Sequence, residues 1–131
     1  MQSHFHAIVW IDHHEAKVFH FNADKVDRAV VRPHDRMVHL HTKAHTIGNG
    51  HAPVDKDFLG RVVEALAGAG TILIVGPAGA KTELANHLAA HAPDLSARVA
   101  GVEAVDHPSD GELVALARRF FHASDRMHPP A

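Results

Sequence analysis

The 131-residue sequence contains no cysteine and no long apolar run. Without thiols the chain can form neither disulfides nor thiolate metal sites, and a cysteine nucleophile is excluded. Its apolar stretches are shorter than the run of about 18 residues that a membrane-spanning helix needs. The N-terminal residues MQSHFHAIVWID also lack the basic region, apolar segment and cleavage site of a signal peptide. We therefore expect no membrane contact and a cytoplasmic location.

The sequence also lacks a nucleotide-binding P-loop, although one stretch looks like it. Residues 72–88 read ILIVGPAGAKTELANHL, in which an apolar strand, a glycine-rich turn and a Lys-Thr pair precede a helix. Gly76 and Gly79 enclose only two residues, whereas a Walker A loop needs four between its glycines. Ala80 stands where that motif has its second glycine, and Pro77 removes an N–H donor from the phosphate cradle. The spacing argues against an NTPase.

The same turn can still bind an anion more weakly than a P-loop does. Gly79, Ala80 and Lys81 open a helix directly after a strand. The free N–H groups of a helix start, its dipole and one lysine attract an anion such as an RNA phosphate. An ordinary strand-to-helix turn is the favoured alternative, because every α/β unit has such ends.

Other catalytic patterns are missing or incomplete. The sequence has no H-E-x-x-H motif, and none of its few serines lies in a G-x-S-x-G elbow. Asp12 and Glu64 are too few carboxylates to hold the two metal ions of a nuclease, and Asp12 is expected to cap a hairpin turn. We therefore expect no catalytic residue, no cofactor and no enzymatic activity.

Histidine is the abundant residue, with 15 copies against 13 of lysine plus arginine. The formal charge of −2 counts histidine as neutral, and partial protonation near pH 7 brings the net charge close to zero. His39, His41 and His45 have the spacing of a possible three-imidazole zinc site. No thiolate or carboxylate partner lies at metal-finger spacing, so histidines facing solvent or RNA are favoured over a metal site. A zinc- or pH-responsive binding protein remains the alternative.

Three strands are predicted at the start of the chain. Residues 4–12, HFHAIVWID, put apolar side chains on both faces, which is typical of a central strand covered on both sides. After a short polar turn, residues 16–22 form a second strand, and residues 26–32 a third that stops at Pro33. These strands form an antiparallel meander.

A polar, histidine-rich segment at residues 34–53 separates the meander from two helix-strand units and is expected to be a long loop. Hydrophobic spacing and breaking residues predict the elements that follow it. These are a helix capped by Asp55 and ending at Gly68 or Gly70, a strand at 71–75, a helix from Lys81 to His91, a strand from Arg98 to Val105 and a final helix.

The final helix begins at a capping box, Ser109 and Glu112, and its predicted buried stripe is Leu113, Leu116, Ala117 and Phe120. On the preceding helix, residues at helical spacing form one face that we expect to be solvated: Glu83, His87 and His91.

This βββαβαβα order predicts the fold. Three antiparallel strands followed by two right-handed crossovers give a five-stranded mixed sheet, ordered 3-2-1-4-5, with helices on its faces. That is a ribonuclease H-like α/β architecture. Residues 1–131 are expected to form a single domain with a frayed tail at 126–131.

Three segments carry a family resemblance: FHAIVWIDHHEAKVFHF, EALAGAGTILIVGPAGAKTELANHL and VEAVDHPSDGELVALARRFF. They resemble the small bacterial proteins called translational machinery proteins. These are similar in turn to the middle domain of archaeal and eukaryotic peptide-release factors and of the ribosome-rescue protein pelota. The likeness spans nearly the whole chain and implies a release-factor-middle-domain fold.

The resemblance also implies what the protein does not do. Release factors carry a Gly-Gly-Gln motif in the loop before the first helix, where this chain has Gly48, Asn49, Gly50 and His51. Without the glutamine, peptidyl-tRNA hydrolysis is not implied. Pelota-like proteins also lack the motif and still act on ribosomes, so the resemblance implies a non-catalytic protein that binds RNA or the ribosome.

The distribution of charge along the chain indicates which segment contacts RNA. From Arg28 to His51 there are four basic residues and one acid, a local charge of +3, which leaves −5 for the rest of the chain. Such a segment attracts phosphates, and histidine rings can stack on unpaired bases, although a merely solvated loop explains the composition equally well. The resemblance favours RNA. The expected RNA-binding residues are Arg28, Arg32, His34, Arg36, His39, His41, Lys43, His45, Asn49 and His51.

The expected partner is the ribosome or its ribosomal RNA or tRNA. A homodimer paired through an edge strand stays open.

Overall fold

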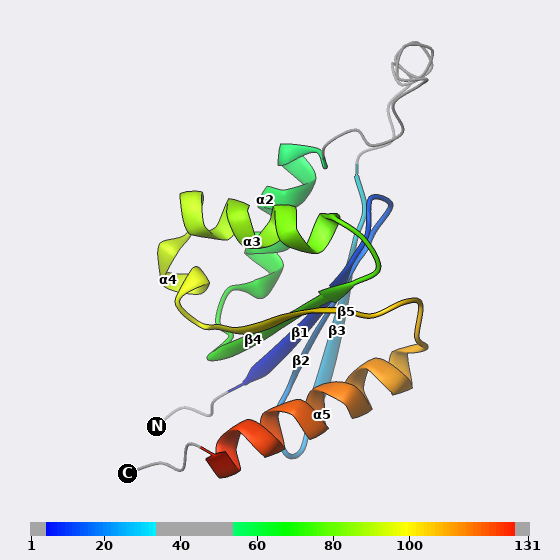
Figure 1. The fold of residues 1–131 in the computed structure, drawn as a ribbon, viewed down its shortest axis with the longest axis vertical. Coiled ribbons are helices and arrows are strands. Elements are labelled where there is room, and N and C mark those ends of the chain that lie inside the picture. The colour runs from blue at the N-terminus through cyan, green and yellow to red at the C-terminus, as the bar shows by residue number, and fades with distance from the viewer. Residues whose placement is uncertain (1–4, 34–53, 128–131) are drawn as a thin grey trace.

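The computed structural model describes residues 5–33 and 54–127 of the chain. The elements in chain order (Figure 1) are β1 (His6–Ile11), β2 (Ala16–Phe21), β3 (Val26–Val31), α2 (Lys56–Leu66), β4 (Thr71–Gly76), α3 (Ala80–His91), α4 (Pro93–Ser96), β5 (Val99–Ala104) and α5 (Asp110–Met127). The type and order of the predicted elements are confirmed. The short helix α4, which has proline at its first position, was not predicted.

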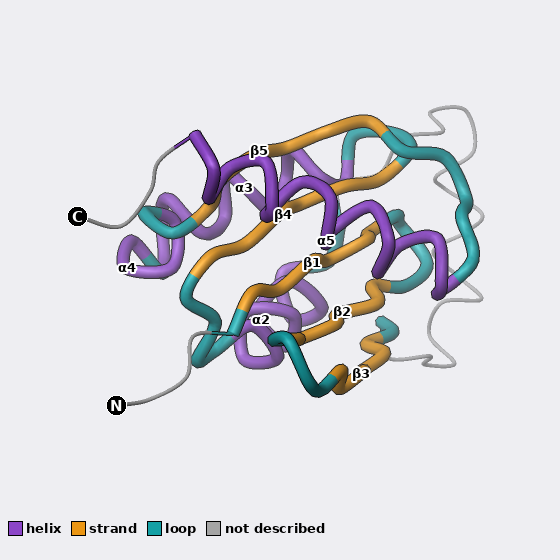
Figure 2. Tube along the Cα trace, turned by 90° about the horizontal axis from the view of Figure 1, so that it is seen from below, coloured by secondary structure: helices purple, strands orange, loops and turns teal. Residues whose placement is uncertain are grey.

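The strands form one mixed sheet in the order β3-β2-β1-β4-β5, as predicted (Figure 2). β1 pairs antiparallel with β2 and parallel with β4, so that Val9 lies between Val18 and Ile74. β2 pairs antiparallel with β3, and β4 pairs parallel with β5. β1 is therefore the central strand, with β3 and β5 at the edges.

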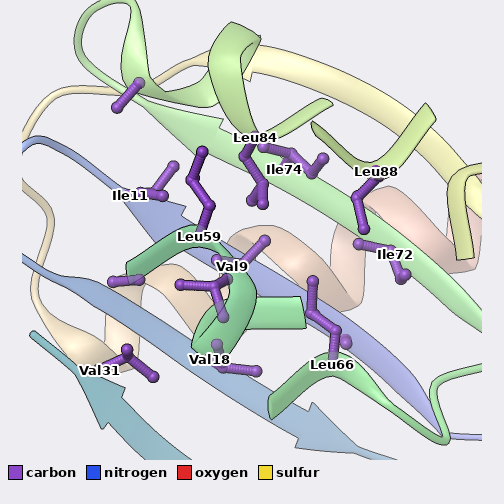
Figure 3. Close-up of a cluster of buried hydrophobic side chains, with 14 of the residues drawn as sticks. Val9, Ile11, Val18, Val31, Leu59, Leu66, Ile72, Ile74, Leu84 and Leu88 are labelled. Atoms are coloured by element: carbon purple, nitrogen blue, oxygen red, sulfur yellow. The ribbon is translucent and has the colours of Figure 1, made fainter. Parts of the chain in front are cut away.

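Helices cover both faces of the sheet. α2 and α3 lie on one face and α5 lies on the other (Figure 1). On the α2–α3 side, Val9 and Ile74 of the sheet meet Leu59 of α2 and Leu84 of α3, all of them buried (Figure 3). None of the helices within residues 5–33 and 54–127 is long and apolar enough to cross a membrane.

The cluster under α5 corrects two predicted contacts. Leu113, Ala117 and Phe121 are buried side chains of this helix, whereas Leu116 and Phe120, which were predicted to be buried, are only partly buried. Positions 113, 117 and 121 are each four residues apart and therefore lie along one line of the helix surface. Phe120 lies beside that line, with a ring atom next to Gly101 of β5, and its ring meets that of Phe121 edge-on.

The helix starts were predicted with mixed success. At α5 the capping box is confirmed, because Ser109 N donates to Glu112 Oε1 at 2.8 Å and Glu112 N donates to Ser109 Oγ at 3.1 Å. At α2 the predicted side-chain cap is wrong. Asp55 occupies the cap position, but its side chain makes no capping hydrogen bond and only its carbonyl oxygen accepts, from Leu59 N.

Gly76, at the end of β4, lies against the backbone of the central strand. A Cβ atom placed on Gly76 would overlap the carbonyl oxygen of Ile11. Because that oxygen belongs to the main chain of a buried strand, it cannot move aside as a side chain would. The first glycine of the P-loop-like stretch is therefore required by strand packing.

Gly76→Ala should destabilise the protein by about 2 kcal/mol or more, because the added methyl group forces the two strands apart. Gly60→Ala is the matched control, since Gly60 lies inside α2 with no atom within 4 Å of its virtual Cβ. That variant should be stabilised by up to about 1 kcal/mol. Urea unfolding measures both, and equal stability of the Gly76→Ala and parent proteins would contradict the packing argument.

Candidate functional site

The candidate site lies at one end of the sheet, which we call the loop end. It comprises the β1–β2 turn at 12–15, Arg32 and Pro33 after β3, Val54 and Asp55 before α2, the turn 77–79 and the loop 105–109. The end of β3 and the start of α2 lie together there (Figure 1). Most of the expected RNA-binding residues lie outside the described residues: His34, Arg36, His39, His41, Lys43, His45, Asn49 and His51.

Asp12 organises the β1–β2 turn. Its Oδ1 accepts hydrogen bonds from the backbone N–H groups of His14 at 2.7 Å and Glu15 at 2.9 Å. This confirms the expected turn cap. The other oxygen, Oδ2, lies 3.9 Å from Nε2 of His107 in the loop before α5. Asp12 is thus committed to the turn and to the neighbouring loop.

The loop before α5 is fixed to the central strand. Trp10 is 2% exposed, and its Nε1 donates to the carbonyl oxygen of Asp106 at 2.7 Å. The His107 ring lies 5.1 Å from the Trp10 ring. These contacts hold residues 106 and 107 beside the Asp12 turn.

Arg28 and Arg32 are the expected RNA-binding residues that the structure describes. Arg28 lies within β3 and Arg32 follows its last residue, Val31, which packs in the α2–α3 cluster. Side chains alternate between the two faces along extended chain, so both arginines point to the opposite, α5 side of the sheet. Arg28 Nε lies 2.9 Å from Asp110 Oδ2, and Arg32 Nη2 lies 3.2 Å from Glu15 Oε1. The side chains are 51% and 69% exposed. Exposed ion pairs of this kind contribute only about 0–1 kcal/mol, so a phosphate can replace the carboxylates at little cost.

The backbone at the end of β3 is held by α2. Arg61 Nη2 donates to the carbonyl oxygen of Arg32, while Arg61 Nε lies 3.3 Å from Asp57 Oδ2. The direction in which the chain leaves the sheet toward residue 34 is therefore set by a helix that comes after that segment.

The start of α3 lies at the same end. The carbonyl oxygen of Gly79 accepts from Thr82 N and Glu83 N, and Ala80 is the first helical residue. Lys81 Nζ donates to the carbonyl oxygen of Ala78, so this lysine folds back over the turn. Gly79, Ala80 and Lys81 are thus brought together as expected from their order, and anion binding by them remains a prediction.

Glu83 was expected to lie on a solvated helix face, and its side chain is 36% exposed, but its two oxygens also contact other elements. Its Oε1 accepts from Val54 N at 2.8 Å, and its Oε2 lies 3.8 Å from His13 Nε2. α3 packs against the start of α2, which brings this carboxylate to the point where the chain returns from residue 53. The periodicity of α3 gave no signal of this contact, because the partner is a backbone group on another element.

The His87 and His91 rings lie 4.5 Å apart on the same face of α3. Partial burial, and then the nearby charges of His91 and Lys56, lower the pKa of His87 from its ordinary value of 6.5. Within residues 5–33 and 54–127 no three histidine, aspartate or glutamate side chains gather to hold a metal ion. His39, His41 and His45 lie outside those ranges, so the zinc alternative stays a prediction.

Comparisons with known proteins identify the fold. No family model matches the chain, and no curated protein matches it. Among solved structures, Archaeoglobus fulgidus Pelota matches with a TM-score of 0.62 at 15% identity over 90% of this chain and 32% of that one. Thermoplasma acidophilum Pelota gives 0.56 at 18% identity, over 85% of this chain and 30% of that one. An archaeal translation termination factor gives 0.54 at 14% identity, over 94% and 39%.

The chain therefore spans about a third of the length of these proteins. At such low identity the likeness concerns the fold. The resemblance to pelota and to release factors that the sequence indicated is confirmed at that level, and membership of the bacterial family stays a prediction.

Glu83→Ala should destabilise the protein by about 1 kcal/mol, because the amide of Val54 loses its acceptor. Glu83→Gln keeps an oxygen in the same place and should retain most of the stability. Amide hydrogen exchange at Val54 gives the local readout, and exchange should be faster in the alanine variant than in the glutamine variant. If both variants protect this amide as the parent does, the contact does not hold the start of α2.

His87 should titrate below 6.5. Because its folded-state pKa is the lower one, the unfolded chain binds more protons, so this residue's contribution to stability is present above pH 6.5 and is lost as the pH falls below it. His91→Gln should raise the pKa of His87 by removing a nearby positive charge. An NMR titration of the histidine ring protons measures both values, and a pKa of His87 at or above 6.5 would contradict the burial argument.

Proposed function

We propose that this protein is a non-catalytic, translation-associated domain that binds RNA or the ribosome through its loop end. The observation that carries the proposal is the position of Arg28 and Arg32. Arg28 lies on edge strand β3 and Arg32 directly after it, and both side chains are exposed, in a fold also found in two Pelota proteins and a translation termination factor. The strand leads directly into residues 34–53, where the positive charge of this region continues.

The chemistry favours contact with phosphate. Arg28 and Arg32 are exposed and their ion pairs with Asp110 and Glu15 are weak, so a phosphate can take the place of either carboxylate at little cost. Neutralisation of RNA phosphates by arginine also releases bound counterions, which supplies much of the affinity at low salt. The segment His34 to His51 would add further arginine, lysine and histidine contacts.

The proposal includes that the protein does not catalyse a release-factor-like reaction. A release-factor-like reaction would need a glutamine at the position of residues 48–51, and the sequence there is Gly-Asn-Gly-His. We therefore propose a binding role on the ribosome, which would place the protein in the cytoplasm. The start of α3, with Gly79, Ala80 and Lys81, lies at the same end and would offer a secondary phosphate contact.

Two double variants test the proposal: Arg28→Ala with Arg32→Ala on β3, and Arg36→Ala with Lys43→Ala in the following segment. Both should weaken RNA binding and lower the slope of log K against log salt by about 0.7 to 0.9 for each phosphate that the protein no longer neutralises. Co-sedimentation with ribosomal particles through sucrose should fall in parallel.

Lys25→Ala with Arg98→Ala is the charge-matched control, because Lys25 lies in the β2–β3 turn and Arg98 at the start of β5, away from the loop end. It should bind with the parent's affinity and salt slope. Binding by both test variants that equals the parent's at low and at physiological salt would show that the loop end is not the contact surface.

A further inference from the structure

A pocket of about 550 Å³ opens at the end of the sheet opposite the loop end. The start of β1, the β2–β3 turn and the C-terminal half of α5 surround it, and these segments lie together at one end of the sheet (Figure 1). Its floor is apolar, because Phe21 and Phe121 are only 2% and 3% exposed. A volume of this size lies within the range of about 300–1,000 Å³ that small-molecule sites occupy.

Two flat polar side chains lie over this floor. The His6 ring stacks on Phe121, with centroids 4.3 Å apart and planes inclined by 14°. The Arg118 guanidinium lies 5.1 Å from the Phe21 ring centre, and its Nη1 donates to the carbonyl oxygen of Asn22 at 3.2 Å. Each polar group is thus supported by a buried phenylalanine, which fixes its orientation before any ligand arrives.

Among the described residues that line the pocket, the positive charge has no carboxylate to compensate it. Arg118 and Arg119 both line it, together with the His6 and His122 rings, and no carboxylate is among the described residues that line it. Arg119 is exposed and forms no hydrogen bond or ion pair with the part of the chain that the structure describes. By contrast, each of the three arginines near the loop end, Arg28, Arg32 and Arg61, has a carboxylate partner.

Adjacent guanidinium groups with free N–H donors fit a phosphate, because the planar fork of arginine matches two oxygens at once. A planar imidazole or guanidinium beside that phosphate position provides a surface on which a nucleobase stacks. A carboxylate metabolite would satisfy the arginines but would leave the flat side chains unused. The combination of cationic and planar groups is the recognition chemistry of a nucleotide.

We propose that this pocket binds a nucleotide, with its phosphate held by Arg118 and Arg119 and its base against the ring of His6 or the guanidinium plane of Arg118. The proposal is independent of RNA binding at the loop end, because the two sites share no residue. The nucleotide has two sources, a free mononucleotide or one nucleotide within a single-stranded RNA.

Isothermal titration of the full chain with AMP, adenosine, inorganic phosphate and a short oligoadenylate tests the pocket. AMP or the oligoadenylate should bind, and adenosine should bind at least about tenfold more weakly than AMP because it lacks the charged group. Binding of AMP identifies a free nucleotide as sufficient, whereas binding of the oligoadenylate alone identifies the RNA chain as the source. If inorganic phosphate binds as tightly as AMP, the base makes no contact and the nucleotide assignment is overturned.

Arg119→Gln is the decisive variant, since Arg119 has no structural partner among the described residues and its loss should not disturb the fold. It should weaken binding by about tenfold or more, as expected for the loss of a charged hydrogen-bond donor. Lys25→Gln removes a charge from the neighbouring turn without lining the pocket, and it should bind as the parent does. Equal affinity of Arg119→Gln and the parent for every ligand overturns the proposal.

The loop-end double variant Arg28→Ala with Arg32→Ala separates the two sites. It should keep the parent's affinity for AMP or the oligoadenylate at the pocket while losing affinity for longer RNA. If oligoadenylate binding instead depends on Arg28 and Arg32 and is insensitive to Arg119, the pocket proposal fails and the loop-end proposal stands.

Discussion

Burial of β1 on both faces is the constraint on which the rest of the structure depends. Ala7, Val9 and Ile11 belong to the cluster under α2 and α3, while Ile8 and Trp10 belong to the cluster under α5. A strand that faces two apolar layers must have partners along both of its edges, because its N–H and C=O groups have no access to water. β2 and β4 supply those partners, and their opposite directions make the sheet mixed.

The fold was predictable because its main signals are periodic. Alternation in residues 4–12 revealed the doubly buried strand, and the Ser109–Glu112 box located the start of α5 to the residue. Which side of a helix faces the core is harder to predict. Phe120 and Phe121 are both phenylalanine, and only the second continues the line of buried residues through Leu113 and Ala117. Contacts between distant parts of the chain leave no periodic trace.

That limit applies most strongly to the polar sites. Glu83 and Val54 meet because α3 packs beside the start of α2, and the pocket joins His6 of the first strand to Arg119 of the last helix. The adjacent pairs Arg-Arg and Phe-Phe at 118–121 were the only sequence signal of that pocket. Only Phe120 of these four was assigned, to the buried stripe of the final helix, and nothing in the sequence placed the N-terminal strand beside them.

The two ends of the sheet differ in how their charge is arranged. Near the loop end Asp110 is shared by Lys17 and Arg28, and Glu15 pairs with Arg32, so cations there exchange one anionic partner for another when they bind phosphate. At the pocket the positive charge of Arg119 has no such partner among the described residues. Salt should therefore weaken the binding of an anionic ligand at either end by screening the charges. At the loop end the ligand also competes with the protein's own carboxylates.

The position of α5 has a consequence for the order in which the chain acquires structure. The helix that covers Ile8 and Trp10 follows every other described element along the chain, and the indole of Trp10 donates to the carbonyl oxygen of Asp106, far along the sequence. Until α5 packs on the sheet, the apolar face of the meander and β4 on that side is exposed to solvent. Contacts between residues far apart in the sequence slow folding and prolong the exposure of such surfaces. The apolar face that includes Ile8 and Trp10 is therefore open to aggregation until α5 docks on it.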